Sequence, residues 1–151
     1  MNREIKFRGK TQWGEWIFGS YVQTDDNSNN PMQHHPLTIS HKIMAYFSGD
    51  WNMGGWSPIE VLPETIGQFI GLADKNATEI FEGDIVKKGD RTYKITWNNL
   101  HAMWGLFTES GQSNEDILCD TTDENGNLMK FWQDSTLTTI GNFYDNPELL
   151  K

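Results

Sequence analysis

Four carboxylates stand within one short stretch, and they are the densest group of residues in the sequence that could do chemistry. Asp74, Glu79, Glu82 and Asp84 belong to residues 66–88, which read I-G-Q-F-I-G-L-A-D-K-N-A-T-E-I-F-E-G-D-I-V-K-K. Two nearby carboxylates can separate in pKa for general acid–base catalysis or share a divalent cation, so a metal-dependent hydrolase is one interpretation. Acids of strands and turns are usually solvated, however, and no His or Lys stands at a matching spacing. We therefore favour a structural role for these acids.

The histidines and the single cysteine give weaker chemical signals. His34, His35 and His41 could bind zinc, but no cysteine is near them, and adjacent residues of an extended segment point to opposite sides. The sequence leaves metal binding by this group open. Cys119 stands among acids, which disfavour the thiolate form that a nucleophile needs. The sequence contains no nucleophile elbow, phosphate loop or dinucleotide-binding motif, so we expect no catalytic residue and no cofactor.

Aromatic residues are abundant in this chain. They make up 13% of it, and seven of them are Trp. Large rings suit half-buried sheet surfaces and are also enriched at protein interfaces. The candidate interaction surface consists of Trp13, Trp16, Trp51 and Trp56. We expect Trp13, Trp16 and Phe18 to pack an N-terminal hairpin on the rest of the chain rather than to stack nucleic-acid bases.

The charge of the chain is strongly negative and unevenly distributed. The net charge is −9; residues 1–60 carry five Lys or Arg and six Asp or Glu, whereas residues 61–151 carry seven and fifteen. Nucleic-acid affinity comes largely from cations that neutralise phosphates, so this balance argues against a general nucleic-acid-binding protein. The exception is a basic cluster near the start, formed by Arg3, Lys6, Arg8 and Lys10. We interpret it as a solvated strand face, with nucleic-acid binding as the alternative.

The elements that would position these residues are mostly strands. Short apolar or alternating runs between turn-forming residues predict strands at residues 5–8, 16–22, 37–47, 66–72, 80–86, 92–97, 103–108, 128–131 and 137–143. Gly83 interrupts one run, where a bulge or a close backbone approach is expected. Residues 48–58 read as a loop and residues 114–119 as a helical turn. Asn146 is a candidate cap for a terminal turn that begins at Pro147.

These strands predict a mainly β protein with two regions in one compact unit. Residues 1–65 would form an N-terminal β-hairpin region with long polar loops, and residues 66–151 a small SH3-like β-barrel core with a short C-terminal helical turn. A flat sandwich is the alternative. The single Cys119 cannot form an internal disulfide, and no secretory or membrane-spanning pattern occurs, so we expect a cytoplasmic location and no membrane contact.

Three segments form a longer pattern that spans the chain. They read I-K-F-R-G-K followed by W-I-F-G-S-Y, then P-E-T-I-G-Q-F-I-G-L-A-D-K-N-A-T-E-I-F-E-G-D-I-V-K, then T-T-I-G-N-F-Y-D-N-P-E-L-L. This pattern resembles the YopX family of phage and prophage proteins. The resemblance implies a phage-derived protein with no catalytic residues to carry over. One departure is Ala77-Thr78, where the family usually places Gly-Lys in the turn after Asp74.

We therefore predict an accessory protein that acts by binding and not by catalysis. The partner would be a host or phage protein in the cytoplasm of the bacterial host, and the chain would self-associate through its aromatic surfaces. The alternatives are a nucleic-acid-binding barrel that uses the basic N-terminal strand, and the metal-dependent hydrolase that uses the carboxylates between residues 74 and 84.

Overall fold

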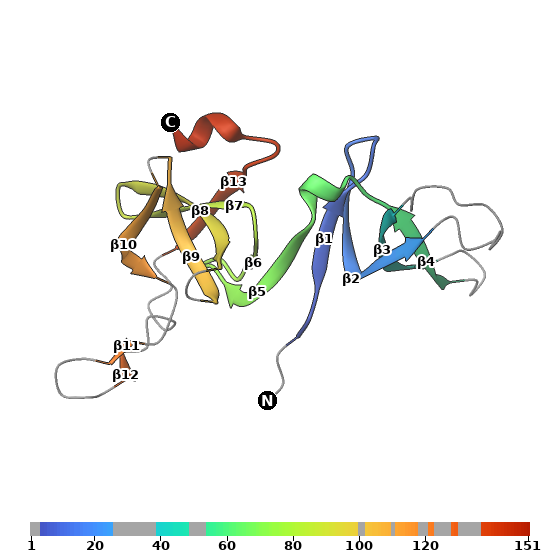
Figure 1. The fold of residues 1–151 in the computed structure, drawn as a ribbon, viewed down its shortest axis with the longest axis horizontal. Coiled ribbons are helices and arrows are strands. Elements are labelled where there is room, and N and C mark those ends of the chain that lie inside the picture. Colours follow the sequence, from blue (N-terminus) through green and yellow to red (C-terminus); the bar gives the residue numbers. More distant parts are fainter. Residues whose placement is uncertain are drawn as a thin grey trace. The chain divides into compact units, whose positions relative to one another are not determined.

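The chain folds into antiparallel strands that divide between two units. The computed structural model describes residues 4–25, 39–48, 54–99, 102–109, 111–117, 121–122, 128–129 and 137–151. The N-terminal unit comprises residues 2–68, and the C-terminal unit begins at Phe69. Strand β5, Gly67–Ala73, runs from one unit into the other (Figure 1). No helix in the described ranges is long and apolar enough to cross a bilayer.

Four strands precede β5 in the N-terminal unit. They are β1 (Phe7–Lys10), β2 (Trp16–Asp25), β3 (Ile39–Phe47) and β4 (Gly55–Glu60), in the sheet order β4-β3-β2-β1. The predicted N-terminal hairpin is confirmed, because β1 pairs with β2. Side chains alternate between the two faces of a strand, and the buried face includes Ile43 and Ala45 of β3. The opposite face carries the side chains that form the candidate site.

The segment after β4 returns to β1 and fixes it at one end. The N–H of Leu62 donates to the carbonyl oxygen of Lys10 at 2.8 Å. The short 3-10 helix η2 (Pro63–Thr65) follows. The Thr65 hydroxyl accepts the N–H of Lys10 at 2.8 Å and donates to the Leu62 carbonyl at 2.7 Å. One buried hydroxyl therefore joins the η2 turn to β1.

The C-terminal unit contains a five-stranded antiparallel sheet. Its strands are β7 (Asp84–Lys88), β8 (Arg91–Asn98), β9 (Met103–Thr108), β10 (Gly111–Ile117) and β13 (Thr138–Asn142), in the order β10-β9-β8-β7-β13. Strand β6 (Glu79–Phe81) pairs with β5, and β11 (Thr121–Thr122) pairs with β12 (Leu128–Met129). The 3-10 helix η3 (Pro147–Leu150) follows β13.

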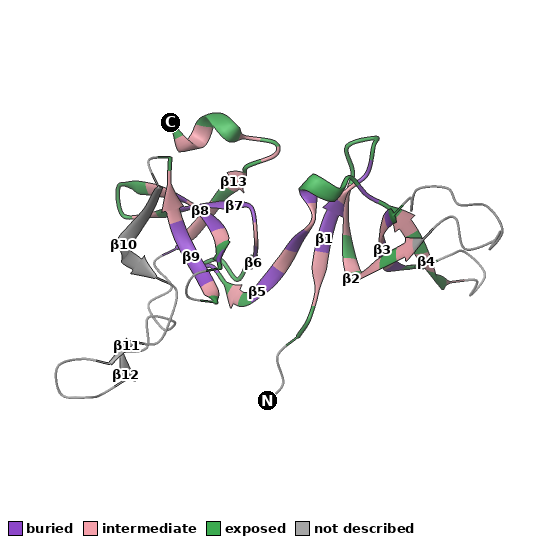
Figure 2. Cartoon of the chain, viewed as in Figure 1, coloured by how far each residue is buried: buried purple, intermediate pink, exposed green. Residues whose placement is uncertain are grey.

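The core of the C-terminal unit is apolar and is built mainly from its successive strands. Its buried residues are Ile70, Ile80, Val86, Tyr93, Ile95, Trp104, Leu106 and Leu137. Strands β7, β8 and β9 carry buried segments, drawn in purple in Figure 2. Strands β7, β8 and β9 form a meander, since they are consecutive in sequence and adjacent in the sheet. Gly89 has a positive φ of 59° in the turn between β7 and β8, which glycine adopts without steric cost.

The predicted mainly β class is confirmed, with two large antiparallel sheets. Each of these sheets ends in an edge strand on both sides, β4 and β6 in one and β10 and β13 in the other. Among the described strands the pairing does not close on itself, so the structure shows no closed barrel.

The predicted single strand at residues 80–86 is wrong. Residues 79–81 form β6 and residues 84–88 form β7, with a tight turn between them. Gly83 has φ +84°, a left-handed conformation that ends an extended strand, and an added Cβ would lie 2.9 Å from Cε2 of Tyr144. The expected close backbone approach at Gly83 is thus confirmed, although it occurs in a turn and not in a bulge.

Two further local predictions are wrong, for reasons of tertiary pairing. Residues 55–58, predicted as loop, belong to β4, because β3 offers them a hydrogen-bonding edge; Pro58 is tolerated there because β4 is an edge strand. Residues 114–117, predicted as part of a helical turn, belong to β10, which pairs with β9.

The predicted side-chain cap of the terminal turn is also wrong. Pro147 does stand in the first turn of η3, but Asn146 makes no side-chain hydrogen bond to its backbone.

Candidate interaction surface

Asp74 stabilises the turn after β5. Its Oδ1 accepts the N–H groups of Asn76 at 2.8 Å and Thr78 at 3.0 Å, and its Oδ2 accepts the N–H of Thr139 in β13 at 2.9 Å. Burial alone would raise the pKa of Asp74, but the hydrogen bonds from Thr139, Thr78 and Asn76 outweigh it and lower the pKa below its ordinary value. The carboxylate is ionised at neutral pH and serves backbone donors.

Asp84 and Glu82, two of the other predicted acids, also interact with their own unit. Asp84 is buried, and its Oδ2 accepts the N–H of Phe81 at 2.8 Å across the tight turn. Glu79 in β6 and Glu82 in the turn are half-buried. Burial lowers the pKa of Lys94, and the charge of Glu82 partly offsets this effect. Asp84 and Glu82 therefore act on the backbone and on a neighbouring cation.

The predicted acids are not gathered into a metal-binding group. Within the part of the chain that the structure describes, no three His, Cys, Asp or Glu side chains are placed to hold a metal ion. His41 lies in β3, where its Nδ1 and the Tyr21 hydroxyl form a hydrogen bond of 2.6 Å; burial raises the pKa of Tyr21. His34, His35 and Cys119 lie outside the described residues.

Three of the four Trp residues predicted to form an interaction surface lie on described parts of the N-terminal unit. Trp13 lies at the tip of the turn between β1 and β2 and is 76% exposed. Trp16 in β2 is half-buried, and Trp56 in β4 is 65% exposed. Trp51 lies outside the described residues. Trp16 and Trp56 are on the same face of the sheet, as the strand registers show.

An aromatic row crosses this face. Tyr46 of β3 pairs in register with Trp56 of β4, and their ring centroids are 5.7 Å apart in an edge-to-face arrangement. Phe18 of β2 belongs to the same face, because it lies two residues from Ser20, whose partner Met44 lies two residues from Tyr46. Tyr46 is 60% exposed and Phe18 45% exposed. That Phe18 packs the hairpin on the rest of the chain stays a prediction.

The basic cluster of β1 lies against the rings of β2. The Arg8 guanidinium carbon is 4.7 Å from the centre of the Trp16 ring, and Lys10 Nζ is 5.9 Å from the same ring. Lys6 Nζ is 6.0 Å from the Phe18 ring. Cations over ring faces are attracted by the ring quadrupole. Arg8 is only 7% exposed, so the interpretation of this cluster as a solvated strand face is wrong for Arg8.

Sequence reasoning missed the contributions of Phe18 and Tyr46 to the site. The period-two spacing of Trp16 and Phe18 was visible in the sequence and predicted that both rings share a face. The position of Tyr46 beside Trp56 depends on the register between β3 and β4, which no local pattern specifies.

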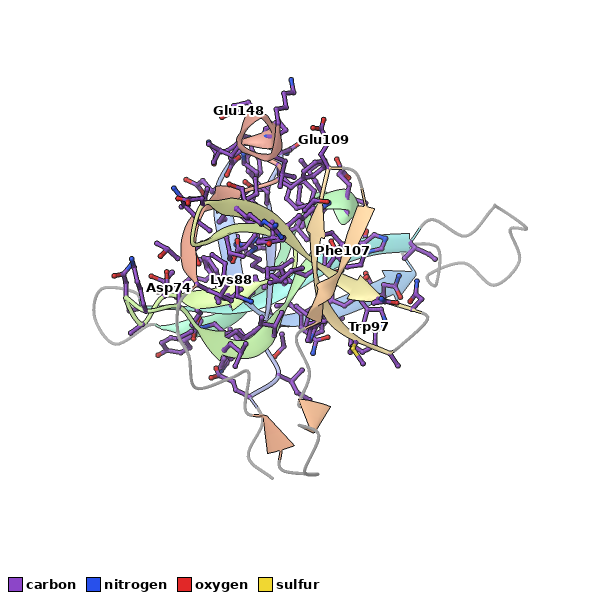
Figure 3. All side chains as sticks on the ribbon, turned by 90° about the vertical axis from the view of Figure 1, so that its left-hand side faces the viewer. Asp74, Lys88, Trp97, Phe107, Glu109 and Glu148 are labelled. Carbon is purple, nitrogen blue, oxygen red and sulfur yellow. The ribbon has the colours of Figure 1, made fainter. Side chains whose placement is uncertain are left out.

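The C-terminal unit has aromatic contacts of a different kind. Trp97 of β8 pairs in register with Trp104 of β9, with ring centroids 5.0 Å apart. Lys94 Nζ lies 3.7 Å from the centre of the Phe143 ring. Figure 3 places Asp74 and Trp97 at opposite sides of this unit, so these two residues form no common site.

Comparison with known proteins identifies a family and finds similar solved structures. A family model described as YopX protein matches residues 6–151. Protein EF1440 from Enterococcus faecalis, known from a crystal structure, is similar with 22% sequence identity and a TM-score of 0.48, over 98% of this chain and 99% of that chain. A search of curated proteins gave no match. Since the family model covers nearly the whole sequence, the chain belongs to the YopX family.

Proposed function

We propose that this YopX-family chain is a phage- or prophage-derived accessory protein that binds a protein partner and self-associates in the cytoplasm of the bacterial host. The main support is the aromatic row, in which the largely exposed rings of Tyr46 and Trp56 contact each other and the partly exposed Phe18 lies on the same face of the N-terminal sheet. Exposed aromatic side chains that lie together are typical of protein interfaces, where Tyr and Trp contribute much of the binding energy.

The positions of the acids support a protein that is not an enzyme. Asp74 accepts three backbone N–H groups, and Asp84 accepts one within a turn. A general base or a metal ligand needs oxygen lone pairs directed at a substrate or an ion. Asp74 directs them at its own backbone. Binding through surface rings requires no such group.

We also propose that the C-terminal unit is a small barrel of the SH3-like kind. The support lies in contacts that join its two sheets. Asp74, at the end of β5, bonds to Thr139 of β13, and the N–H of Lys75 donates to the Leu137 carbonyl at 3.1 Å. The N–H of Gly83, after β6, donates to the Ile95 carbonyl of β8 at 2.9 Å.

Light scattering on a size-exclusion column, together with partner capture from phage-infected bacterial extract, tests the binding function. The wild-type chain is expected to exceed its monomer mass of 17.4 kDa or to retain a defined protein. The double substitution Tyr46→Ser, Trp56→Ser should abolish either form of association, because it removes the two most exposed rings of the row.

Phe47→Ser is the matched control. Phe47 is also exposed, but it follows Tyr46 in β3 and so lies on the opposite face. Its replacement should leave association unchanged. A wild-type chain that is monomeric at every concentration and retains no protein beyond those retained by the double variant would overturn the proposal.

A thermal-shift series with Mg²⁺, Mn²⁺, Ca²⁺ and Zn²⁺ tests the proposal that the chain is not a metal-dependent enzyme. A cation that binds the folded state raises the melting temperature by mass action. We expect no increase with any of the four ions. An increase that Glu79→Gln or Glu82→Gln removes would favour the metal-dependent hydrolase instead.

A further inference from the structure

We infer that Pro58 prevents the edge strand β4 from pairing with the β4 strand of a second copy, so that two copies meet through the aromatic row and not through the sheet edge. The inference rests on the self-association in the proposed function and specifies how the copies join. Pro58 thereby determines specificity, because it excludes one of the two ways in which two sheets can associate.

The backbone groups of β4 point alternately towards β3 and away from the sheet. Among the described strands, β4 is the end strand of the N-terminal sheet. Glu60 pairs in register with Lys42, so Val61 stands opposite His41, and the N–H of Val61 donates to the His41 carbonyl at 2.9 Å. In an antiparallel ladder, hydrogen-bonded pairs alternate with pairs whose N–H and C=O groups face away from each other. The pair next to Val61 and His41 is of the second kind, and so is every second pair from there.

Pro58 is the middle one of three outward positions, between Trp56 and Glu60. All three residues are exposed. Trp56 and Glu60 each direct an N–H and a C=O out of the edge, whereas Pro58 offers only a carbonyl, because its nitrogen carries no hydrogen. The ring of Pro58 costs the ladder with β3 no hydrogen bond, since the missing donor faces outward. It removes the donor from the centre of the edge instead.

The effect is greatest when a second copy supplies the incoming strand. Two identical edges that join around a twofold axis form an antiparallel pair. The register that uses all three outward positions sets Pro58 opposite Pro58 of the second copy, and Trp56 opposite Glu60 of the second copy. The central pair then lacks both of its hydrogen bonds, and the two proline rings face each other. A register shifted by two residues still contains both prolines, each opposite an outward-facing residue.

The aromatic row needs none of these backbone groups. The Trp56 ring lies on the face of the sheet, where its centroid is 5.7 Å from that of Tyr46. Side chains stand out from the face of a sheet, whereas edge N–H and C=O groups lie within its plane. Contact through the rings therefore leaves the backbone of the edge unpaired. The two modes of association make opposite predictions for the amides of Trp56 and Glu60.

Amide hydrogen exchange of the wild-type chain, followed by NMR over a range of concentrations, tests the state of the edge. We expect the N–H groups of Trp56 and Glu60 to be at least about tenfold less protected than those of Ser57 and Ile59, which face β3. This difference should persist when the chain self-associates. Equal protection of all four amides would show that the edge is paired and would overturn the inference.

Pro58→Thr supplies the missing donor and opens the edge. Light scattering on a size-exclusion column should detect association at concentrations at least about tenfold below those that the wild type needs. Pro63→Thr is the matched control, because Pro63 is exposed in η2, outside β4, and its replacement should change this concentration less than about twofold. The new association should persist in the triple variant Tyr46→Ser, Trp56→Ser, Pro58→Thr.

Two results with these variants would contradict the role of Pro58. They are a folded Pro58→Thr variant that associates no more readily than wild type, and a triple variant that loses the gain. If Pro58→Thr does not fold, the exchange pattern of the wild type decides.

Failure of the inference is distinguishable from failure of the proposed function. If Tyr46→Ser, Trp56→Ser abolishes association but the edge amides of the wild-type assembly are protected, the inference fails and the proposed function stands. If that variant associates normally while the edge amides stay unprotected, the proposed function fails and the role of Pro58 stands.

Discussion

Asp74 and Thr139 are 65 positions apart in the sequence, and a hydrogen bond of 2.9 Å joins the Asp74 carboxylate to the Thr139 N–H. The same carboxylate organises its own turn through Asn76 and Thr78. One side chain thus connects the turn after β5 to β13. Asp74 belongs to the four carboxylates that could have formed a catalytic site. Its hydrogen bonds to the backbone explain why it is buried and why its pKa is lowered.

Asp74→Asn should lower the free energy of unfolding by about 1.5–3 kcal/mol at pH 7, because an amide places a donor where the carboxylate accepted a backbone N–H. Because the folded-state pKa is lowered, the stability from ionised Asp74 is complete above about pH 4, the ordinary value, and is lost as pH falls through the folded pKa. Urea denaturation at several pH values should show the difference from wild type narrowing below about pH 4.

Asp90→Asn is the matched control for this substitution. Asp90 is exposed in the turn between β7 and β8, so its replacement should change stability by less than about 0.5 kcal/mol. A difference between wild type and Asp74→Asn that is as large at pH 3 as at pH 7 would contradict the assigned role of the charge.

Ala77→Gly should stabilise the protein. Ala77 has φ +62°, a left-handed conformation that costs an L-residue about 1–2 kcal/mol and costs glycine almost nothing. Glycine also makes the unfolded chain more flexible, which offsets part of this stabilisation. The expected net increase in the free energy of unfolding is about 0.5–1 kcal/mol. The denaturation midpoint measures it. Ala73→Gly, in the adjoining strand β5, should instead destabilise; an equal effect at both sites would refute the backbone explanation.

Gly83→Ala should destabilise more than Gly71→Ala. Both glycines have positive φ, +84° and +90°, so alanine meets a similar backbone cost of about 1–2 kcal/mol at each. Only at Gly83 would the new Cβ meet the Tyr144 ring, whereas the space around Gly71 is open. Overpacking should add about 1–3 kcal/mol at Gly83. If thermal unfolding showed the same loss of stability for both variants, the contact between Gly83 and Tyr144 would be disproved.

Thr65→Val should cost about 1–3 kcal/mol of stability, because the Lys10 N–H loses the hydroxyl acceptor that it has in the folded protein. The valine side chain has nearly the same shape, so packing changes little. Thr65→Ser keeps the hydroxyl and should lose less, about 1 kcal/mol for the missing methyl group. If chemical denaturation shows the serine variant to be less stable than the valine variant, packing and not the hydrogen bond dominates at this site.

The strands were largely predictable because their signals are local. In β8, the apolar residues Tyr93 and Ile95 alternate with polar ones, a pattern set by side-chain direction along a strand. The turn at Gly89-Asp90 follows from the backbone preferences of these two residues. The split of residues 79–88 into two strands was missed because Gly83 fits a bulge or a turn equally well. The choice between them is made by contacts with distant residues such as Tyr144.

The sequence by itself determined the family, the mainly β class and the abundance of Trp residues, because each follows from residue types and from patterns within short segments. The tertiary structure alone decided that Asp74 serves the backbone, that Arg8 is stacked on Trp16, and that Tyr46 lies beside Trp56. The two ring contacts depend on the register between paired strands, and the Asp74 contact depends on a residue 65 positions away. A shift of one residue in that register would move every side chain of a strand to the other face.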